Sequence, residues 1–276
     1  MTQPLTLDEL CIHQVCVWKQ SSFASSLDSF ARHGVTKTAL WRPMVEDVGV
    51  KRARQILGDS GVAAISMCPL VLLDPDQPLD RASRERRQDA FLADAAELGV
   101  ESVVVITGGL PPGSKDLAGR RSAVLEELAR LIPVAAESGV KLALEPLHPM
   151  VCGFRSVIST LAEANDILDA LDRDDVIGIA VDSYALWWDP NLQDEIARAG
   201  TRLFNFHVSD WLPETHDVRV DRGMSGDGLI DNALIRSWMA EAGYAGSVEV
   251  EILSEHWWLK QTDTVVSTIC DRLDRM

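Results

Sequence analysis

The chain contains 276 residues, of which 46% are hydrophobic, and its formal net charge at pH 7 is −16. This length and apolar content are sufficient to bury the core of one α/β barrel. The acidic charge disfavours nucleic acids and anionic membranes as partners, because both bind basic protein surfaces. The acidic residues are spread along the chain, so we expect most of them on solvated helix faces. No apolar run approaches the roughly 18 residues that a membrane-spanning helix needs.

The five cysteines show neither a CxxC pair nor a metal-binding spacing; they are Cys11, Cys16, Cys68, Cys152 and Cys270. The first ten residues, MTQPLTLDEL, lack the basic and apolar segments of an export signal. An odd number of cysteines without such a signal favours free thiols in a reducing compartment. We therefore expect a cytoplasmic protein.

Eight short apolar segments are typical of strands: residues 11–17, 37–42, 62–68, 102–108, 141–146, 176–182, 203–209 and 247–253. Helical patterns separate them, most clearly at 81–99. The apolar face expected there comprises Ala90, Phe91, Leu92, Ala93, Ala95, Ala96 and Leu98. Glycines end the helical segments shortly before a strand, namely Gly34, Gly61, Gly99, Gly139, Gly200 and Gly243. Repeated αβ units with short loops indicate a parallel sheet.

We predict a single (β/α)8 TIM barrel over residues 1–276, with its active site at the C-terminal ends of the strands. An open, doubly wound sheet is the alternative. Such a sheet normally has fewer strands, and no GxGxxG turn follows the first strand here.

Ionisable side chains lie at the ends of the last four predicted strands. Glu145 ends KLALE, Asp182 ends GIAVD, and His207 lies in LFNFHVS. The final segment, SVEVEIL, carries Glu249 and Glu251, which alternation places on the same side of a strand. Glu251 is nearer the strand end, so we assign it to the rim. We expect Glu249 one layer deeper, where it supports the site or pairs with a basic side chain.

One buried carboxylate alone can be a partner in a structural ion pair. Several at the same rim repel one another unless a cation lies between them, because removing each charge from water costs several kcal/mol. We therefore predict a divalent metal site. The expected ligands are Glu145, Asp182, His207 and Glu251. This oxygen-rich set without thiolates favours Mn²⁺, with Mg²⁺, Co²⁺ and Zn²⁺ as alternatives.

Five stretches of the sequence resemble the xylose isomerase-like TIM barrel family; in order they are EPLHPM, VDSYALWWDP, FHVSDW, DRGMSGDG and GSVEVEIL. That family groups sugar phosphate isomerases and epimerases, including ketose 3-epimerases and inosose isomerases, with endonuclease IV as a distant relative. The resemblance extends from LWRPMVEDVG, residues 40–49, onward.

The resemblance implies that Glu145 and Glu251 are also the catalytic acid/base pair, one on each face of the substrate. One removes the proton beside a metal-bound carbonyl, and the other reprotonates the cis-enediolate. The chain departs from the family pattern at Ala185, where a substrate-contacting His is common, and at PLHP, which replaces an Asn/Arg-containing signature. His148 and His216 are the candidates to supply the missing imidazole.

Four further side chains are expected to bind substrate: His148, Trp188, Trp211 and Arg222. Arg222 either binds a hydroxyl, carboxylate or phosphate of the substrate, or braces its loop by pairing with Asp221 or Asp227. The tryptophans at 187, 188, 211, 257 and 258 crowd the loops after the last strands. They stack on the substrate, pack in the core, or form a subunit interface in a homo-oligomer.

The predicted function is that of a divalent-metal-dependent isomerase or epimerase acting on a sugar or keto-polyol through an enediolate. Two alternatives remain open at this stage. One is a lyase that uses the same metal site for β-elimination, of the C-glycoside-cleaving or dehydratase type. The other is a catalytically impaired binding subunit, for which Ala185 is the sequence support. A nuclease with three zinc ions is disfavoured, because the chain has only six histidines.

Overall fold

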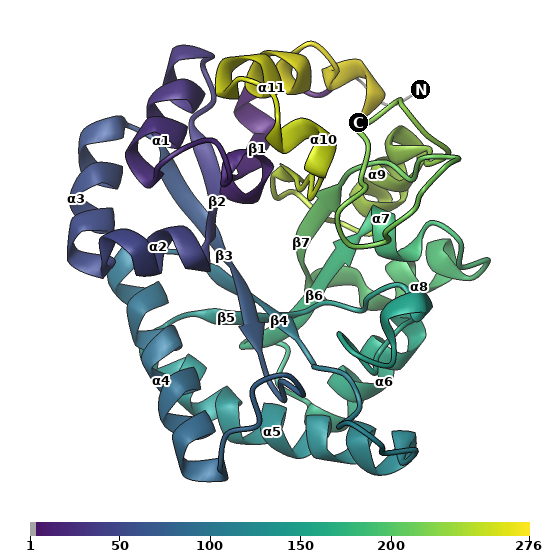
Figure 1. The fold of residues 1–276 in the computed structure, drawn as a ribbon. Helices are drawn as coiled ribbons and strands as arrows, with labels where there is room; N and C mark the ends of the chain where they lie inside the picture. Colours follow the sequence, from purple (N-terminus) through teal and green to yellow (C-terminus); the bar gives the residue numbers. More distant parts are fainter. Residues whose placement is uncertain (1–3) are drawn as a thin grey trace.

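Eight parallel strands close into one barrel in a computed structural model that describes residues 4–276 (Figure 1). The strands are β1 (Leu10–His13), β2 (Lys37–Trp41), β3 (Ala63–Val71), β4 (Ser102–Ile106), β5 (Lys141–Leu144), β6 (Ile177–Asp182), β7 (Leu203–Val208) and β8 (Val248–Val250). They follow one another around the barrel, and β8 pairs with β1. This closure confirms the (β/α)8 prediction and excludes the open sheet. The start of the predicted domain, residues 1–3, lies outside the described part of the chain.

Helices form a ring around the barrel (Figure 1). They are α1 (Phe23–Arg32), α2 (Arg42–Val48), α3 (Val50–Ser60), α4 (Arg81–Leu98), α5 (Leu117–Ser138), α6 (Leu161–Leu171), α7 (Ser183–Leu186), α8 (Leu192–Ala199), α9 (Asn232–Glu241), α10 (Glu255–Trp258) and α11 (Thr262–Cys270). Most of the apolar core lies between strands and helices, while Cys68, Val104, Ala143 and Ala180 form a separate small cluster.

Several strands end earlier than the sequence predicts. The first predicted strand, 11–17, divides into β1 and a 3-10 helix, η2 (Gln14–Val17). Strand β5 ends at Leu144, before Pro146, which has no N–H group for a sheet hydrogen bond. Strand β8 covers only Val248–Val250 of the predicted 247–253. Glu145 and Glu251 therefore lie one residue beyond their strands, although their N–H groups still donate to Val105 and Val208.

The glycines end the helical units as predicted. Gly61, Gly99 and Gly139 follow α3, α4 and α5 in the left-handed conformation, which a residue without Cβ adopts at low cost. The predicted apolar face of α4 is partly wrong, because Ala90 and Ala93 are exposed. Gln88 is buried there instead, and it donates to the Leu72 carbonyl, so a polar side chain contributes to the packed face.

Strand register brings the ionisable residues to one level. Asp182 on β6 pairs with His207 on β7, and His207 pairs with Glu249 on β8. Neighbouring residues of a parallel sheet share a face, so these side chains point to the same side of the barrel wall. Residues two positions away along a strand also face that side, and Asn205 therefore lies on the same side as His207.

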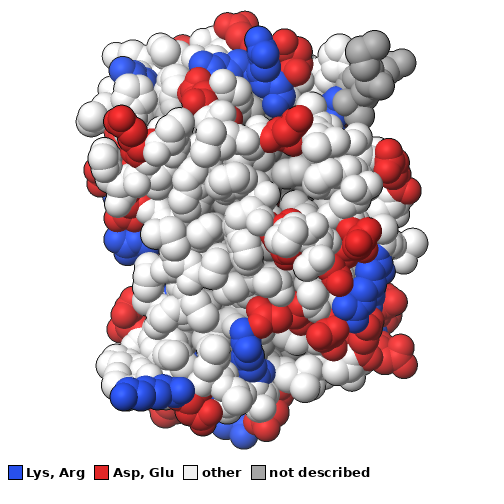
Figure 2. Space-filling model, turned by 90° about the vertical axis from the view of Figure 1, so that its right-hand side faces the viewer, with Lys and Arg blue, Asp and Glu red and all other residues white. Residues whose placement is uncertain are grey.

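The charged surface matches the expectation of solvated acidic helix faces. Figure 2 shows acidic and basic side chains intermingled around the margins of one face of the molecule, while the middle of that face is largely uncharged. Among residues 4–276, no helix combines the length and the apolar composition that crossing a membrane requires.

A matched pair of glycine substitutions tests the packing of the barrel wall. A Cβ atom at Gly178 in β6 would lie 2.4 Å from the Arg202 carbonyl oxygen and 2.6 Å from the Phe204 ring. Gly178→Ala is therefore expected to destabilise the protein by about 2 kcal/mol, as overpacking of a core does. At Gly58 in α3, no described atom lies within 4 Å of such a Cβ. Gly58→Ala should stabilise the protein by about 0.5–1 kcal/mol, because Ala favours a helix. Urea unfolding measures both, and equal midpoints would contradict the prediction.

Candidate metal centre and active site

The four predicted metal ligands all lie at the C-terminal end of the barrel. Asp182 ends β6, His207 is the penultimate residue of β7, and Glu145 and Glu251 directly follow β5 and β8. All four are buried, and Glu251, the most exposed of them, has 4% of its surface exposed. Burial at this depth requires that each charge meets an opposite charge or a hydrogen-bond donor.

Three of these side chains meet directly. The Nδ1 atom of His207 lies 3.0 Å from Oε1 of Glu145 and 3.9 Å from Oε2 of Glu251. One ligand atom from each of the three residues lies within 4.8 Å of the others, close enough for a single metal ion. Asp182 does not join this triad directly. It adjoins Glu251 through Arg222, whose Nη1 atom lies 3.0 Å from Oδ2 of Asp182 and 2.9 Å from Oε2 of Glu251.

The contacts of Arg222 exclude one of the two roles predicted for it, namely bracing of its own loop by an ion pair. It does not pair with Asp221 or Asp227: the Asp221 carboxylate accepts a backbone N–H, and Asp227 pairs with another arginine. Arg222 instead extends into the barrel, is 8% exposed, and lies over the Tyr184 ring with its Cζ atom 4.5 Å from the ring centre. The acidic cluster therefore contains a cation of its own.

Glu249 occupies the deeper layer that the sequence indicates. Its Oε2 atom accepts a hydrogen bond from Ser66 Oγ at 2.6 Å and lies 3.2 Å from His13 Nε2. Its Oε1 atom accepts from Asn205 Nδ2, also at 2.6 Å. The Nε2 atom of His207 lies 3.8 Å from Oε2 of Glu249. Ser66, Asn205 and His13 thus surround Glu249 below the cluster, and Glu249 faces the nitrogen of His207 on the far side of the ring from Glu145.

Burial and charge shift the pKa values of the cluster in opposite directions. Burial raises the pKa of Glu145 to about 7, against its hydrogen bond with His207. Burial alone would lower the pKa of His207, but the hydrogen bond with Glu145 and the surrounding carboxylates raise it to about 10. Burial opposes the ionisation of Glu251, yet Arg222 and the two histidines lower its pKa to about 2. Glu251 is therefore a firmly ionised carboxylate, neutralised by Arg222.

A cavity opens directly above the cluster. Its lining includes Glu145, Glu251 and Arg222, together with His148, Tyr184 and Ala185. The Tyr184 hydroxyl is buried and, in the described part of the chain, has no hydrogen-bond partner. A polar group of this kind beside a cavity is suited to bind a hydroxyl group of a ligand.

The predicted substrate-binding residues divide into two groups. His148 and Arg222 line the cavity. Trp188 and Trp211 are not among its lining residues; their rings lie 5.8 Å and 4.7 Å from the His148 ring, and Trp211 stacks on Tyr184 at 4.9 Å. These tryptophans therefore support the side chains that line the cavity.

The position of Ala185 is now defined. Ala185 is buried and lines the cavity together with His148, whereas His216 is exposed on a loop and does not line it. Of the two histidines considered as replacements for an imidazole at position 185, only His148 is placed to act in this cavity.

The sequence interpretation missed His13, Ser66 and Asn205 as partners of Glu249. A signal was present for Asn205, which precedes His207 by two residues and so faces the same side of β7. Ser66 and His13 have weaker signals, because each is a polar side chain within an otherwise apolar strand. Their meeting with Glu249 depends on closure of the barrel between β8 and β1.

Known proteins resemble this chain in sequence and in structure. The family model for xylose isomerase-like TIM barrels matches residues 27–272. Inosose isomerase from Halalkalibacterium halodurans is 29% identical over 152 residues, which are 52% of this chain and 50% of that protein. The match to this curated relative thus spans about half its length.

Two solved structures extend the resemblance to the whole fold. Protein SMc04130 from Sinorhizobium meliloti 1021 has 37% identity and a TM-score of 0.91, with 98% of both chains covered. The IolI protein, solved with a bound zinc atom, has 20% identity and a TM-score of 0.80, with 95% of both chains covered. At 20% identity the second likeness concerns the fold alone.

Substitution of Glu249 tests the deeper layer. Glu249→Gln keeps the shape of the side chain but directs an amide N–H₂ group at donors, so we expect a loss of about 3 kcal/mol in unfolding free energy. Glu255→Gln, at an exposed position in α10, is the matched control and should change stability by less than about 0.5 kcal/mol. Equal urea midpoints for the two variants would show that the hydrogen bonds to Glu249 do not stabilise the barrel.

Proposed function

Because the chain belongs to the xylose isomerase-like TIM barrel family, we propose that it is a divalent-metal-dependent isomerase or epimerase of a sugar or keto-polyol. The observation that supports this most directly is the buried triad of Glu145, His207 and Glu251 at the end of the barrel. The relative named inosose isomerase supports a cyclic keto-polyol as one substrate class.

The donor set fits a divalent metal. Carboxylate oxygens and one imidazole suit Mn²⁺, Mg²⁺, Co²⁺ or Zn²⁺, and the IolI protein, which has a similar fold, was solved with a bound zinc atom. The Oδ2 atom of Asp182 is buried and, among residues 4–276, accepts no hydrogen bond although Arg222 lies 3.0 Å away. We propose four ligands, namely Glu145, Asp182, His207 and Glu251. When bound, the metal would supply a Lewis acid that stabilises negative charge on a substrate oxygen.

The protein's own groups would position the substrate and move the proton. Glu145 and Glu251 approach from β5 and β8, and both line the cavity, so each can reach a substrate carbon placed between them. One carboxylate would take the proton beside the carbonyl, and the other would return a proton to the enediolate. Arg222 donates a hydrogen bond of 2.9 Å to the Glu251 carboxylate and so fixes its orientation.

The upper part of the cavity would bind substrate hydroxyl groups. The unpartnered Tyr184 hydroxyl and the His148 ring face this space, and Ala185 leaves room that a longer side chain would fill. Trp211 stacks on Tyr184 and contacts His148 in a tilted arrangement, so it would hold both rings in place. Binding of hydroxyl groups by such fixed rings selects for the arrangement of hydroxyl groups on the substrate.

The proton-transfer step can be tested by solvent exchange. Purified protein with Mn²⁺ should incorporate deuterium from D₂O at the carbon beside the carbonyl of an inosose or a ketose, as followed by NMR. Glu145→Gln should slow this exchange by about 10³-fold, within the range attributed to a positioned acid or base. Glu255→Gln is the control and should leave the rate unchanged. Exchange at the wild-type rate in Glu145→Gln would refute the assignment of Glu145, and release of an enone or an aglycone would indicate a lyase.

Metal binding can be tested without turnover. Mn²⁺ at about 100 times its dissociation constant should stabilise the folded protein by about 2.7 kcal/mol, because it binds the native state. Asp182→Asn should bind Mn²⁺ less tightly and show a smaller rise in melting temperature at the same concentration. Mn²⁺ that is already complexed by EDTA serves as the control. The proposed site would be refuted if free Mn²⁺ stabilised neither protein, or both equally.

A further inference from the structure

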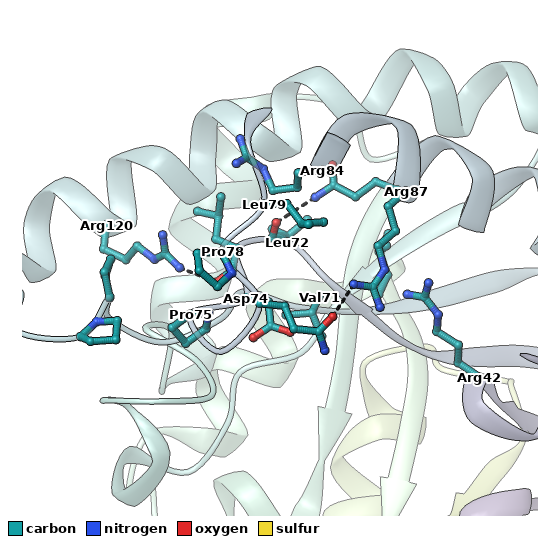
Figure 3. A pocket seen from close by; sticks show the side chains of 16 residues that line it. Arg42, Val71, Leu72, Asp74, Pro75, Pro78, Leu79, Arg84, Arg87 and Arg120 are labelled. Atoms are coloured by element: carbon teal, nitrogen blue, oxygen red, sulfur yellow. Dashed lines mark hydrogen bonds between the residues drawn. The ribbon is translucent and has the colours of Figure 1, made fainter. Parts of the chain in front are cut away.

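A second cavity lies outside the acidic cluster, and none of the proposed metal ligands lines it. It has a volume of about 260 Å³ and is bounded by the end of β3, the segment leading to α4, and the first turn of α5. Four arginines line it, Arg42, Arg84, Arg87 and Arg120, with Asp74 as the only carboxylate among the lining residues (Figure 3). Such a concentration of positive charge is unexpected in a chain with a net charge of −16.

Two of the four arginines are neutralised from outside the cavity. The Nε atom of Arg42 lies 2.6 Å from Oε1 of Glu46, which is one helical turn away on α2. An Nη atom of Arg84 lies 3.3 Å from Oε2 of Glu127 on α5. The Nε atom of Arg84 is nevertheless buried without a hydrogen-bond partner among residues 4–276.

The other two arginines meet only neutral acceptors. Arg87 extends from α4 toward the loop that carries Asp74, and it donates to the side-chain oxygen of Gln77 at 2.7 Å (Figure 3). Arg120 donates to the backbone carbonyls of Gly109, at 2.8 Å, and Leu73. Within the described chain, neither arginine forms an ion pair. Burial lowers the pKa of Arg120, and the positive charge of Arg84 lowers it further.

Asp74 does not compensate this charge. Its Oδ1 atom accepts a hydrogen bond from the backbone N–H of Asp76 at 2.9 Å, so the carboxylate is used to shape its own loop. No described arginine lies within ion-pair distance of it. Apart from Gln77 and Gln88, the rest of the wall is apolar and includes Leu79 and four prolines at positions 75, 78, 111 and 112.

We propose that this cavity binds a phosphate group. Guanidinium groups match the oxygens of phosphate in geometry and charge, and hydrogen bonds between two charged partners are stronger than those between neutral groups. Arg87 and Arg120 provide charge that no carboxylate compensates among the described residues, and the prolines provide an apolar surface for the carbon skeleton of a phosphate ester. The site does not depend on the proposed metal or on the proposed reaction.

Calorimetric titration of the full chain tests this site with three probes: inorganic phosphate, glucose 6-phosphate and glucose. The two phosphates should bind with saturation, and glucose should not. Arg87→Gln should weaken the binding of phosphate by about tenfold, corresponding to the loss of one charged hydrogen bond. Arg86→Gln is the matched control, because Arg86 directly precedes Arg87 on α4, is exposed, donates to Ser83, and is not among the residues that line the cavity. It removes the same charge but should leave the affinity unchanged.

The possible outcomes decide between distinct conclusions. Equal binding of both phosphates would indicate a site for the free anion, and tighter binding of the ester a site for a phosphorylated metabolite; both support the proposal. Absence of saturable binding would refute it. Equal affinities in Arg87→Gln and the wild type would also refute it, because the anion would then bind elsewhere, such as at a metal centre. The readout requires no turnover, so failure here leaves the proposed isomerase function untouched.

Discussion

The site depends on how four buried carboxylates are accommodated in the interior of one barrel. Each would be unstable there alone, because removing a charge from water costs several kcal/mol unless partners replace the lost hydration. The chain solves this in two layers. In the lower layer, Ser66, Asn205 and His13 surround Glu249. In the upper layer, Arg222 joins Asp182 to Glu251. His207 lies between Glu145 and the two glutamates Glu249, on β8, and Glu251, directly after it.

The fold and the positions of the ionisable groups were accessible from the sequence for a simple reason. Glycines that end helices and short apolar strands repeat along the chain, and each αβ unit adds one strand to a parallel sheet. The C-terminal ends of those strands meet at one face, so any ionisable residue at a strand end is brought to that face. Alternation placed Glu249 and Glu251 on the same side of their strand, and nearness to the strand end assigned Glu251 to the rim; the structure places Glu249 deeper as expected.

The partners of these groups could not be predicted in the same way. Asp221 and Asp227 were expected as ion-pair partners of Arg222 because they are close to it in sequence. The guanidinium instead points into the barrel, where it pairs with Asp182 at the end of β6 and Glu251 directly after β8. The contact between His13 and Glu249 joins residues 236 positions apart and exists because β8 closes on β1. A sequence pattern reports the periodicity of one element, whereas these contacts require the register of several.

The two cavities lie on either side of the end of β2. Trp41, the last residue of β2, lines the cavity above the metal-ligand candidates, and the next residue, Arg42, lines the cavity with four arginines. Arg42 is fixed by Glu46 and by the Phe91 ring, which lies 4.8 Å from its Cζ atom. The end of β2 thus lies between the cavity proposed to bind metal and substrate and the cavity proposed to bind phosphate. Both cavities border β2 and β3, yet no residue lines both, so a substitution in the lining of one leaves the lining residues of the other in place.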